Sequence, residues 1–581
     1  MERPPKRARA SPDSADEDTR GRPSKIYTPL KSLDTSISPP PRTRSQPSQG
    51  PDACPELASC QSETPNNTKT GESTRSPRLV PSPIQLTHIR DFHDSEGCNV
   101  DAVRLRDILG DPMIRECWQF NYLFDVDFLM HQFDEDVRNL VKVRVVHGSW
   151  EKEAPNRIRV DEACSRYSNV EPVIAYMPER FGTHHSKMMI LLRHDDLAQI
   201  VIHTANMIPG DWAHMTQAAW RSPLLPLKKP GAPATPQKNS SIGSGARFKR
   251  DILAYLKAYG PKKTGPLVQQ LENYDFGTIR AALVASVPSK QRFSSLDSEK
   301  STIWGWPALK DLMGRVPILQ QIKYGKSQST KPHIVTQISS VASLGQTDKW
   351  LKDVFFKALA PTKATPRYSI IFPTTEEIRR SLNGYASGGS IHMKTQSAPQ
   401  QKQLQYMRPY LCQWAGGDHS NSNLIDLSED KPFKQEAGRG RAAPHIKTYI
   451  RFSDAETMDT IDWAMITSAN LSTQAWGAAT NANDEVRISS FEIGVVVWPD
   501  LFADDTVAQS STSEAERQSA VMVPCFKQDL PLSPTKNLAD TVVGFRMPYD
   551  LPLTPYRASD EPWCATAPHH LPDWLGQSWI V

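Results

Sequence analysis

A short polar signature occurs twice in this chain of 581 residues. His185-Ser186-Lys187 is followed by Asn206, nineteen residues after the lysine, and His445-Ile446-Lys447 is followed by Asn470, twenty-three residues after the lysine. The contexts also match, because the tripeptide at 204–206 (TAN) has a counterpart at 468–470 (SAN). The doubled signature indicates an internal duplication in which each half contributes half of one pseudo-symmetric cleft.

Strands are expected around both copies of the signature. The apolar runs predict strands at 186–192 and 199–204 in the first half, and at 446–451 and 463–467 in the second. Residues i and i+2 of a strand share a face, so the histidine and lysine of each copy should point the same way. Each asparagine should then lie in the turn after the following strand, within reach of the same point.

The remaining pattern predicts α/β layers in both halves. Further strands are expected at 140–146, 281–287, 333–339, 368–372 and 492–498, and helices at 105–109, 248–259, 267–274, 306–313 and 350–359. Alternating strands and helices indicate a sheet flanked by helices in each half. We place a disordered tail at 1–84, an N-terminal domain at 85–292 and a C-terminal domain at 293–581, with the boundary in the polar stretch 288–300.

The first 84 residues contain 15 of the 48 prolines and a single aromatic residue, Tyr27. Such a segment buries too little apolar surface to offset the entropy of ordering it. The basic run Lys6-Arg7-Ala8-Arg9 is a candidate nuclear-import patch, which predicts a nuclear protein. A solvated basic run is the alternative interpretation.

The bulk composition excludes some classes of protein. No apolar run approaches the ~20 residues of a membrane helix, and the N-terminus lacks the apolar region of a secretory signal. The eight cysteines include no CxxC pair, which is typical of reduced intracellular thiols rather than disulfides or a zinc site. A net charge of +4 permits nucleic-acid binding without requiring it.

Two histidines, two lysines and two asparagines around one point suit the cleavage of a phosphodiester. Ammonium groups neutralise the non-bridging oxygens, and amides donate hydrogen bonds to them. One neutral imidazole can attack phosphorus to form a phospho-histidine, while the other protonates the leaving oxygen and later deprotonates water. No Asp, Glu and His residues stand near the signature at metal-ligand spacing, so we expect neither a metal nor a cofactor.

The two copies resemble the signature of the phospholipase D superfamily, H-x-K-x4-D with a later G-S-x-N. Leu192 and Phe452 occupy the two aspartate positions, and His203-Thr204 replaces the first Gly-Ser. With the stretches 182–189 (GTHHSKMM) and 444–449 (PHIKTY), these departures resemble tyrosyl-DNA phosphodiesterases of the 3′-end-processing kind. The resemblance covers most of residues 86–581.

The resemblance implies a role for each site residue. His185 would be the nucleophile toward a DNA 3′-phosphate, and His445 the acid that releases tyrosine and the base that hydrolyses the intermediate. Lys187, Lys447, Asn206 and Asn470 would hold the phosphate. Glu492 and Gln217 would orient the imidazoles across the two-fold axis, Glu492 with His185 and Gln217 with His445.

The resemblance also implies contacts with both parts of the substrate. Ser340 and Ser343 match residues that contact the DNA backbone, and Phe181 matches a residue that stacks on a base; a packed strand-end aromatic is the alternative for Phe181. Tyr122 and Trp563 are expected to border the peptide side of the cleft. The expected partners are single- and double-stranded DNA 3′ ends and a topoisomerase I-derived peptide, bound by a monomer that does not associate with membranes.

Two alternative functions and one further partner follow from the sequence. The chain could be a lipid-cleaving phospholipase D, although no lipid-targeting module is visible, or a DNA-end-binding protein without activity, although both copies of the signature are intact. Separately, the heptad LIDLSED, from Leu424 to Asp430, resembles a SUMO-interacting motif. A polar loop without a partner is the alternative interpretation of that heptad.

Overall fold

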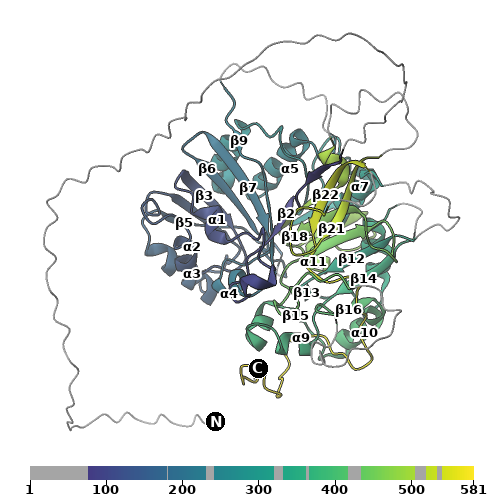
Figure 1. The fold of residues 1–581 in the computed structure, drawn as a ribbon. Helices are drawn as coiled ribbons and strands as arrows, with labels where there is room; N and C mark the ends of the chain where they lie inside the picture. The colour runs from purple at the N-terminus through teal and green to yellow at the C-terminus, as the bar shows by residue number, and fades with distance from the viewer. Residues whose placement is uncertain are drawn as a thin grey trace, which may run out of the picture. The chain divides into compact units, whose positions relative to one another are not determined.

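The computed structural model describes residues 76–179, 181–229, 241–318, 331–361, 365–416, 434–503, 518–532 and 539–581. The basic run at 6–9 and the heptad 424–430 lie outside the described residues. The chain forms an N-terminal and a C-terminal lobe, each built on a mixed sheet (Figure 1). The predicted α/β fold class, with mixed sheets flanked by helices, is confirmed.

The sheet of the N-terminal lobe runs in the order β2-β8-β7-β6-β3-β4-β5, and β9 pairs with β7. These strands are β2 (Ile84–Leu86), β3 (Ile114–Phe120), β4 (Lys142–His147), β5 (Val170–Ile174), β6 (Met188–Arg193), β7 (Leu197–His203), β8 (Ala218–Arg221) and β9 (Leu225–Pro226). Strands β3, β4 and β5 are parallel, and β6 runs antiparallel to both β3 and β7. The sheet is therefore mixed.

Helices cover both faces of this sheet. They are α1 (Leu105–Leu109), α2 (Val126–Met130), α3 (Pro155–Ser165), α4 (Pro209–Ala213), α5 (Gly245–Lys257) and α6 (Pro261–Glu272), with a 3-10 turn η1 (Asp94–Glu96). Side chains of β6 alternate between two cores, with Met188 and Ile190 in the core of α5 and α6, and Met189 and Leu191 in the core of α1 to α3. Burial on both faces explains the unbroken apolar run of this strand.

The sheet of the C-terminal lobe runs in the order β1-β22-β21-β18-β17-β12-β14-β16, and β20 pairs with both β10 and β18. Its strands are β1 (Arg78–Val80), β10 (Ala282–Ser286), β12 (His333–Gln337), β14 (Arg367–Ile371), β16 (Leu411–Cys412), β17 (Thr448–Phe452), β18 (Ile461–Thr467), β20 (Glu492–Val497), β21 (Gln518–Cys525) and β22 (Ala539–Arg546). Two small ribbons pair β11 (Ser289–Arg292) with β19 (Glu485–Ile488) and β13 (Ser340–Val341) with β15 (His392–Met393).

The helices of the C-terminal lobe are α7 (Gly305–Arg315), α8 (Lys357–Leu359), α9 (Thr375–Arg379), α10 (Ala398–Met407) and α11 (Thr473–Trp476). The 3-10 turns are η2 (Phe293–Ser295), η4 (Gly384–Ser390), η5 (Arg408–Tyr410) and η6 (Pro499–Phe502), and η3 (Trp350–Phe356) is a π-helix. Most of the predicted helix at 350–359 therefore has the wider π-helical hydrogen-bond pattern. No described helix is long and apolar enough to cross a membrane.

The two lobes repeat one topology. The order β8-β7-β6-β3-β4-β5 of the first sheet corresponds to β20-β18-β17-β12-β14-β16 of the second, with the same parallel and antiparallel neighbours. Strands β6 and β17, which follow the two His-x-Lys segments, occupy equivalent places. The duplication inferred from the signature therefore extends over these six strands of each sheet.

Two expected boundaries differ from the structure. The tail was expected to end at residue 84, whereas Arg78 already begins β1, which pairs with β22. The domain boundary was expected after residue 292, whereas β10 already belongs to the C-terminal sheet, where it pairs with β20 as β2 pairs with β8 in the other lobe. The polar stretch 288–300 looked like a linker because β11 lies in an exposed two-stranded ribbon with β19.

Candidate active site

Each His-x-Lys segment is held against the opposite lobe by its backbone. His184 forms a β-bridge with Phe491, and Thr216 forms the equivalent bridge with Pro444. The backbone N–H of His185 donates to the carbonyl of Phe491 at 2.9 Å, and that of Ile446 donates to the carbonyl of Thr216 at 2.9 Å. These bridges place each histidine beside the residue that follows the bridge on the other lobe, Glu492 or Gln217.

The strands next to the signature begin later than the sequence predicted. Strand β6 starts at Met188 and β17 at Thr448, directly after the two lysines, rather than at residues 186 and 446. The reason is that the segments before these strands leave their own sheets to bridge to the other lobe. The two asparagines lie three residues beyond the ends of β7 and β18, in the turns where they were expected.

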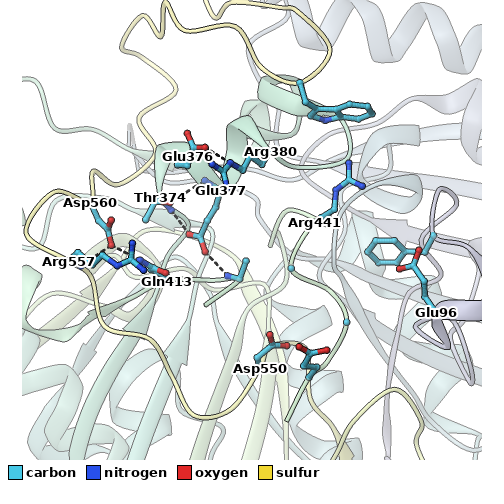
Figure 2. A pocket seen from close by; sticks show the side chains of 16 residues that line it. Glu96, Thr374, Glu376, Glu377, Arg380, Gln413, Arg441, Asp550, Arg557 and Asp560 are labelled. Carbon is cyan, nitrogen blue, oxygen red and sulfur yellow. Dashed lines mark hydrogen bonds and ion pairs between the residues drawn. The ribbon is translucent and has the colours of Figure 1, made fainter. Parts of the chain in front are cut away.

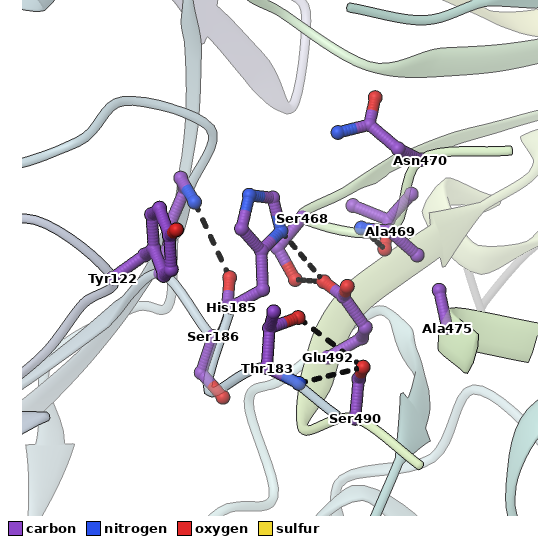
Figure 3. A network of polar contacts seen from close by, with 12 residues as sticks. Tyr122, Thr183, His185, Ser186, Ser468, Ala469, Asn470, Ala475, Ser490 and Glu492 are labelled. Carbon is purple, nitrogen blue, oxygen red and sulfur yellow. Dashed lines mark hydrogen bonds and ion pairs between the residues drawn. The ribbon is translucent and has the colours of Figure 1, made fainter. Parts of the chain in front are cut away.

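His185 is hydrogen-bonded to a buried carboxylate (Figure 3). Its Nδ1 lies 3.0 Å from Oε2 of Glu492, and the hydroxyl of Ser468 donates to the same oxygen at 2.5 Å. The carboxylate accepts the Nδ1 proton, so the Nε2 of the neutral imidazole carries a free lone pair. Burial and the nearby ammonium of Lys187 lower the pKa of His185, although Glu492 opposes this shift. A free base at Nε2 is the state that a nucleophile needs.

His445 is hydrogen-bonded to an amide and also lies beside a second carboxylate. Its Nδ1 lies 2.9 Å from Nε2 of Gln217 and 3.2 Å from Oδ2 of Asp211. The hydroxyl of Thr204 donates to Oε1 of Gln217 at 2.8 Å and thereby fixes the orientation of the amide. Thr204 and Ser468 are equivalent in the two copies, so each holds the partner of one imidazole. The expected pairing across the axis, Glu492 with His185 and Gln217 with His445, is the one observed.

The two lysines of the signature have no exposed surface. The Nζ of Lys187 donates to the carbonyl of His185 at 3.3 Å, and the Nζ of Lys447 contacts the carbonyl of His445 and lies 3.3 Å from its Nε2. Burial lowers the pKa of Lys187 to about 8, although Glu492 and Asp211 oppose the shift. Burial and then the charge of Lys187 lower the pKa of Lys447. The charge of Lys187, in the first half-site, thus affects the pKa of Lys447 in the second.

The same groups act on His445. Burial lowers its pKa well below the ordinary value, and the charges of Lys447, Lys187 and His185 add to this effect. A phosphodiester brings a negative charge that would offset the lysines and favour the protonated imidazole. The site is therefore complementary to one anion placed between its two halves.

The two asparagines complete the set. The Oδ1 of Asn470 accepts from the backbone N–H groups of Ser339 and Ser340 at 3.0 and 2.9 Å, which leaves its Nδ2 free to donate. The backbone N–H of Asn206 donates to Asp211 at 2.7 Å, and its buried side-chain Oδ1 has no partner among the described residues. The Nδ2 of Asn470 is thus available to donate to a bound oxyanion, and the unpartnered Oδ1 of Asn206 shows that this amide is not tied up by a donor in the described part of the protein.

The comparisons with known proteins agree with this geometry. Residues 83–557 match the family model described as tyrosyl-DNA phosphodiesterase. A probable tyrosyl-DNA phosphodiesterase of Schizosaccharomyces pombe is 30% identical over 565 residues, covering 87% of this chain and 97% of the relative. The chain belongs to the tyrosyl-DNA phosphodiesterase family. It is thus a phosphodiester hydrolase of the metal-independent phospholipase D superfamily, as the signature predicted.

Other members of the family are similar over most of their length. Tyrosyl-DNA phosphodiesterase 1 of Arabidopsis thaliana is 28% identical over 533 residues, covering 86% of this chain and 77% of the relative. A crystal structure of the yeast tyrosyl-DNA phosphodiesterase matches with a TM-score of 0.55 at 19% identity and covers 84% of this chain and 100% of that chain. The structural match supports the fold.

The residues expected to contact substrate lie in different settings. Tyr122 is 42% exposed with its ring 5.5 Å from that of His185, and Phe181 is 77% exposed, four residues before the same histidine. Ser343 is exposed, while Ser340 lies in the segment whose amide holds Asn470. The expectation for Trp563 was wrong. Its side chain is fully buried and donates to the carbonyls of Gly388 and Ile391, so it cannot border a bound peptide.

Asp211 lies in the site beside His445, but the sequence did not predict it as a site residue. It lies in α4, five residues after Asn206, and is 1% exposed. The position five residues after Asn470 holds Ala475, so comparison of the two copies gave no sign of a carboxylate. A single acidic residue in the segment Pro-Gly-Asp-Trp, at 209–212, was the available signal.

A cavity of about 650 Å³ lies apart from the six signature residues (Figure 2). Carboxylates, arginines and Trp574 line it, and none of the predicted site residues does. Its partly buried member Glu377 accepts from the backbone N–H groups of Thr374 and Ala415, so it has a structural role as the third helical residue in the capping box of α9, whose N-cap is Thr374. Within the described ranges, no group of three or more His, Cys, Asp or Glu side chains could hold a metal ion.

Proposed function

We propose that this family member hydrolyses the 3′-phosphotyrosyl bond between DNA and a topoisomerase I-derived peptide, and related 3′ adducts, in DNA repair. The observation that carries the proposal is the pair of imidazoles, each held by a partner from the opposite lobe, beside two buried lysines. The family to which the chain belongs supports the substrate class.

The first step would form a phospho-histidine. The Nε2 of His185 attacks phosphorus, and the bond from phosphorus to the tyrosyl oxygen breaks. The Nε2–H of His445 donates its proton to that oxygen, so tyrosine leaves as a neutral phenol. Lys187 and Lys447 neutralise the charge on the non-bridging oxygens, and the amides of Asn206 and Asn470 donate to them.

The second step would return the enzyme to its starting state. The Nε2 of His445, now neutral, takes a proton from water while the water oxygen attacks phosphorus. The bond from phosphorus to His185 breaks, which leaves a 3′-phosphate on DNA and the proton on His445. A separate phosphatase is required before ligation, because a ligase needs a 3′-hydroxyl.

The substrate-binding residues extend the proposal beyond the phosphate. Ser340 and Ser343 would contact the DNA backbone, and Phe181 would stack on a base, a contact worth about 1–3 kcal/mol that tolerates any sequence. Tyr122 would border the tyrosine side, since its ring faces His185. Single-stranded and double-stranded 3′ ends would both be substrates, because none of these contacts reads a base edge.

Turnover of a 3′-phosphotyrosyl oligonucleotide tests the proposal. Release of tyrosine and of a 3′-phosphate end, with no hydrolysis of phosphatidylcholine vesicles, is expected. Binding of the oligonucleotide without turnover would favour a non-catalytic end-binding protein, and lipid hydrolysis would favour a phospholipase D. We also propose that the protein acts as a monomer, because one chain supplies both half-sites. A nuclear location is proposed from the basic run at 6–9, and a SUMO contact from the heptad at 424–430, both on sequence alone.

A further inference from the structure

Asp211 is placed to act on the second imidazole of the site, an inference that rests on the proposed function. Its Oδ2 lies 3.2 Å from Nδ1 of His445 and accepts the backbone N–H of Asn206 at 2.7 Å. The amide nitrogen of Gln217 donates to the same oxygen at 3.3 Å, and the hydroxyl of Ser390 donates to Oδ1 at 3.3 Å. The carboxylate is therefore fixed by three donors with one oxygen next to the imidazole.

Only some neighbours of His445 can accept its Nδ1 proton. A cationic imidazole carries protons on both nitrogens, so each nitrogen needs an acceptor. The nearest atom to Nδ1 is the amide nitrogen of Gln217, which is itself a donor, and the amide oxygen lies farther away at 3.3 Å and accepts from Thr204. Among the described residues, Asp211 presents the one carboxyl oxygen that lies within reach of Nδ1, at 3.2 Å. It can hold the protonated state that the leaving group requires.

The duplicated lobes show that the carboxylate has changed position. In the half-site of His185, the residue that follows the cross-lobe bridge is Glu492, and the residue five positions after Asn470 is Ala475. In the other half-site the same two positions hold Gln217 and Asp211. Each imidazole thus has one carboxylate partner, supplied by β20 for His185 and by α4 for His445.

The charge of the site also depends on Asp211. Two lysines and two carboxylic residues, Glu492 and Asp211, are buried in the site. Burial raises the pKa of Asp211, whereas the backbone N–H of Asn206 and the charges of Lys447 and Lys187 oppose this shift and favour the carboxylate. The titratable groups that face His445 are Asp211, Lys447, Lys187, His185 and His392. Asp211 is the anionic member of this group, so its loss leaves His445 among cations and neutral imidazoles.

We propose that Asp211 is the positioning residue of His445, whose carboxylate accepts the imidazolium Nδ1–H and presents Nε2–H to the leaving oxygen. Asp211 does not touch the reacting atoms. It acts through His445, in the way that Glu492 acts through His185.

The substitution Asp211→Asn tests the proposal, since it removes the charge and keeps the shape. Two oligonucleotides are compared, one with tyrosine and one with 4-nitrophenol on the 3′-phosphate, because 4-nitrophenolate leaves without a proton. General acid catalysis contributes about 10²–10⁴-fold. We expect at least a hundredfold loss of single-turnover rate with tyrosine and less than a tenfold loss with 4-nitrophenol. The alkaline limb of kcat/KM for tyrosine release, which reports the loss of the His445 proton, should move to lower pH.

A second substitution distinguishes positioning from structural support. Adding Gln217→Glu to Asp211→Asn moves the carboxylate to the place that Glu492 occupies in the other half-site, and should restore tyrosine release at least tenfold. Asp462→Asn is the matched control, because Asp462 is equally buried, pairs with Arg451 at 2.6 Å and lies at the far end of β18. It should change neither the ratio between the two substrates nor the pH profile.

The proposal would be overturned if Asp211→Asn lost the same rate with both leaving groups, kept the pH profile and was not rescued by Gln217→Glu. Full activity of Asp211→Asn would also overturn it. Should that variant not fold, ¹⁵N-histidine NMR of the unaltered protein decides, with His445 assigned by its absence in His445→Gln. A neutral His445 that keeps its proton on Nδ1, next to Asp211, supports the role, and a neutral His445 that keeps its proton on Nε2 overturns it. Turnover by the unaltered protein is measured first, so failure of the proposed function is seen separately.

Discussion

The two imidazoles of the site differ in what holds them. His185 faces a carboxylate that favours a free base at Nε2, whereas His445 faces an amide and shares its Nδ1 with Asp211. His185 is also the more accessible of the two, with 15% of its side chain exposed against 3% for His445. The difference supports the assignment of His185 as nucleophile and His445 as acid and base.

Substitution of each histidine should therefore have a different consequence. His185→Ala removes the nucleophile, so turnover should fall on the order of 10⁴-fold or more, without an adduct. His445→Asn leaves the nucleophile but removes the base of the second step, so a covalent enzyme–DNA adduct should accumulate. A denaturing gel with a labelled oligonucleotide detects it. Equal, adduct-free loss in both variants would contradict the roles, and His333→Gln, a buried histidine bonded to Ser369, is the control.

The lysines predict the alkaline side of the pH dependence. Lys187 has a pKa lowered to about 8, and only its ammonium form can neutralise a phosphate. Above pH 8 this charge is lost, so kcat/KM should fall there by about tenfold per pH unit more than the loss of the His445 proton alone causes. Bound phosphate favours the ammonium form, so the limb of kcat should lie at higher pH than that of kcat/KM. Coincident limbs, or a flat kcat/KM from pH 7 to 10, would contradict this account.

The site residues that could be predicted are those that occur in both copies. His185, Lys187 and Asn206 were found because residues 445, 447 and 470 repeat them, and the cross-lobe bridges lie directly before the two His-x-Lys segments. Asp211 occurs in one copy only and was missed. The burial of Trp563 could not be predicted either, because it depends on the folding of η4 against the C-terminal segment.

At the level of elements, the ends of β7 and β18 set the orientation of the imidazole partners. Thr204 follows β7 and donates to Gln217, and Ser468 follows β18 and donates to Glu492. Backbone bonds fix both hydroxyls, since Ala218 donates to Thr204 and Ile493 donates to Ser468. The strand ends therefore hold not only the asparagines but also the groups that orient the histidines.

Removal of the hydroxyl at the end of β18 should weaken catalysis without loss of the fold. A hydrogen bond to a charged group is worth about 1.5–3 kcal/mol, so Ser468→Ala should lower kcat/KM about 10- to 100-fold, and Ser468→Thr should retain most activity. Ser472→Ala, which removes the cap of α11 in the same segment, is the control for stability. Loss of activity in proportion to the fall in melting temperature in both variants would rule out a role for the Glu492 contact.

The elements themselves were largely predictable, and their partners were not. The strands after the signature were expected within two residues, because apolar runs buried on both faces are unmistakable. Pairing across the lobes was not visible, since a bridge such as His184 to Phe491 joins segments 307 residues apart without a local pattern. The same applies to β10, whose place in the second sheet depends on β20.

At the scale of the whole molecule, one core joins the two sheets. It contains Met188 and Ile190 of the first sheet together with Ile450 and Ile493 of the second. The active-site edge of each sheet therefore rests on residues that the other sheet also contacts. A change in this core should move one half-site relative to the other, whereas a change in the outer core of one lobe should not.

Two matched substitutions test this distinction. Phe491 is 3% exposed, lies in the shared core and stacks on Tyr259 at 4.3 Å, while Phe356 is 4% exposed, lies in the outer core of the C-terminal lobe and stacks on Tyr368 at 4.0 Å. Each change to alanine should cost about 3–5 kcal/mol of unfolding free energy, measured by urea denaturation.

Per folded molecule, Phe491→Ala should lose at least tenfold in kcat/KM, because Phe491 precedes Glu492 and forms the bridge to His184. Phe356→Ala should keep nearly full activity, and equal activities of the two folded variants would show that the shared core does not set the geometry of the site.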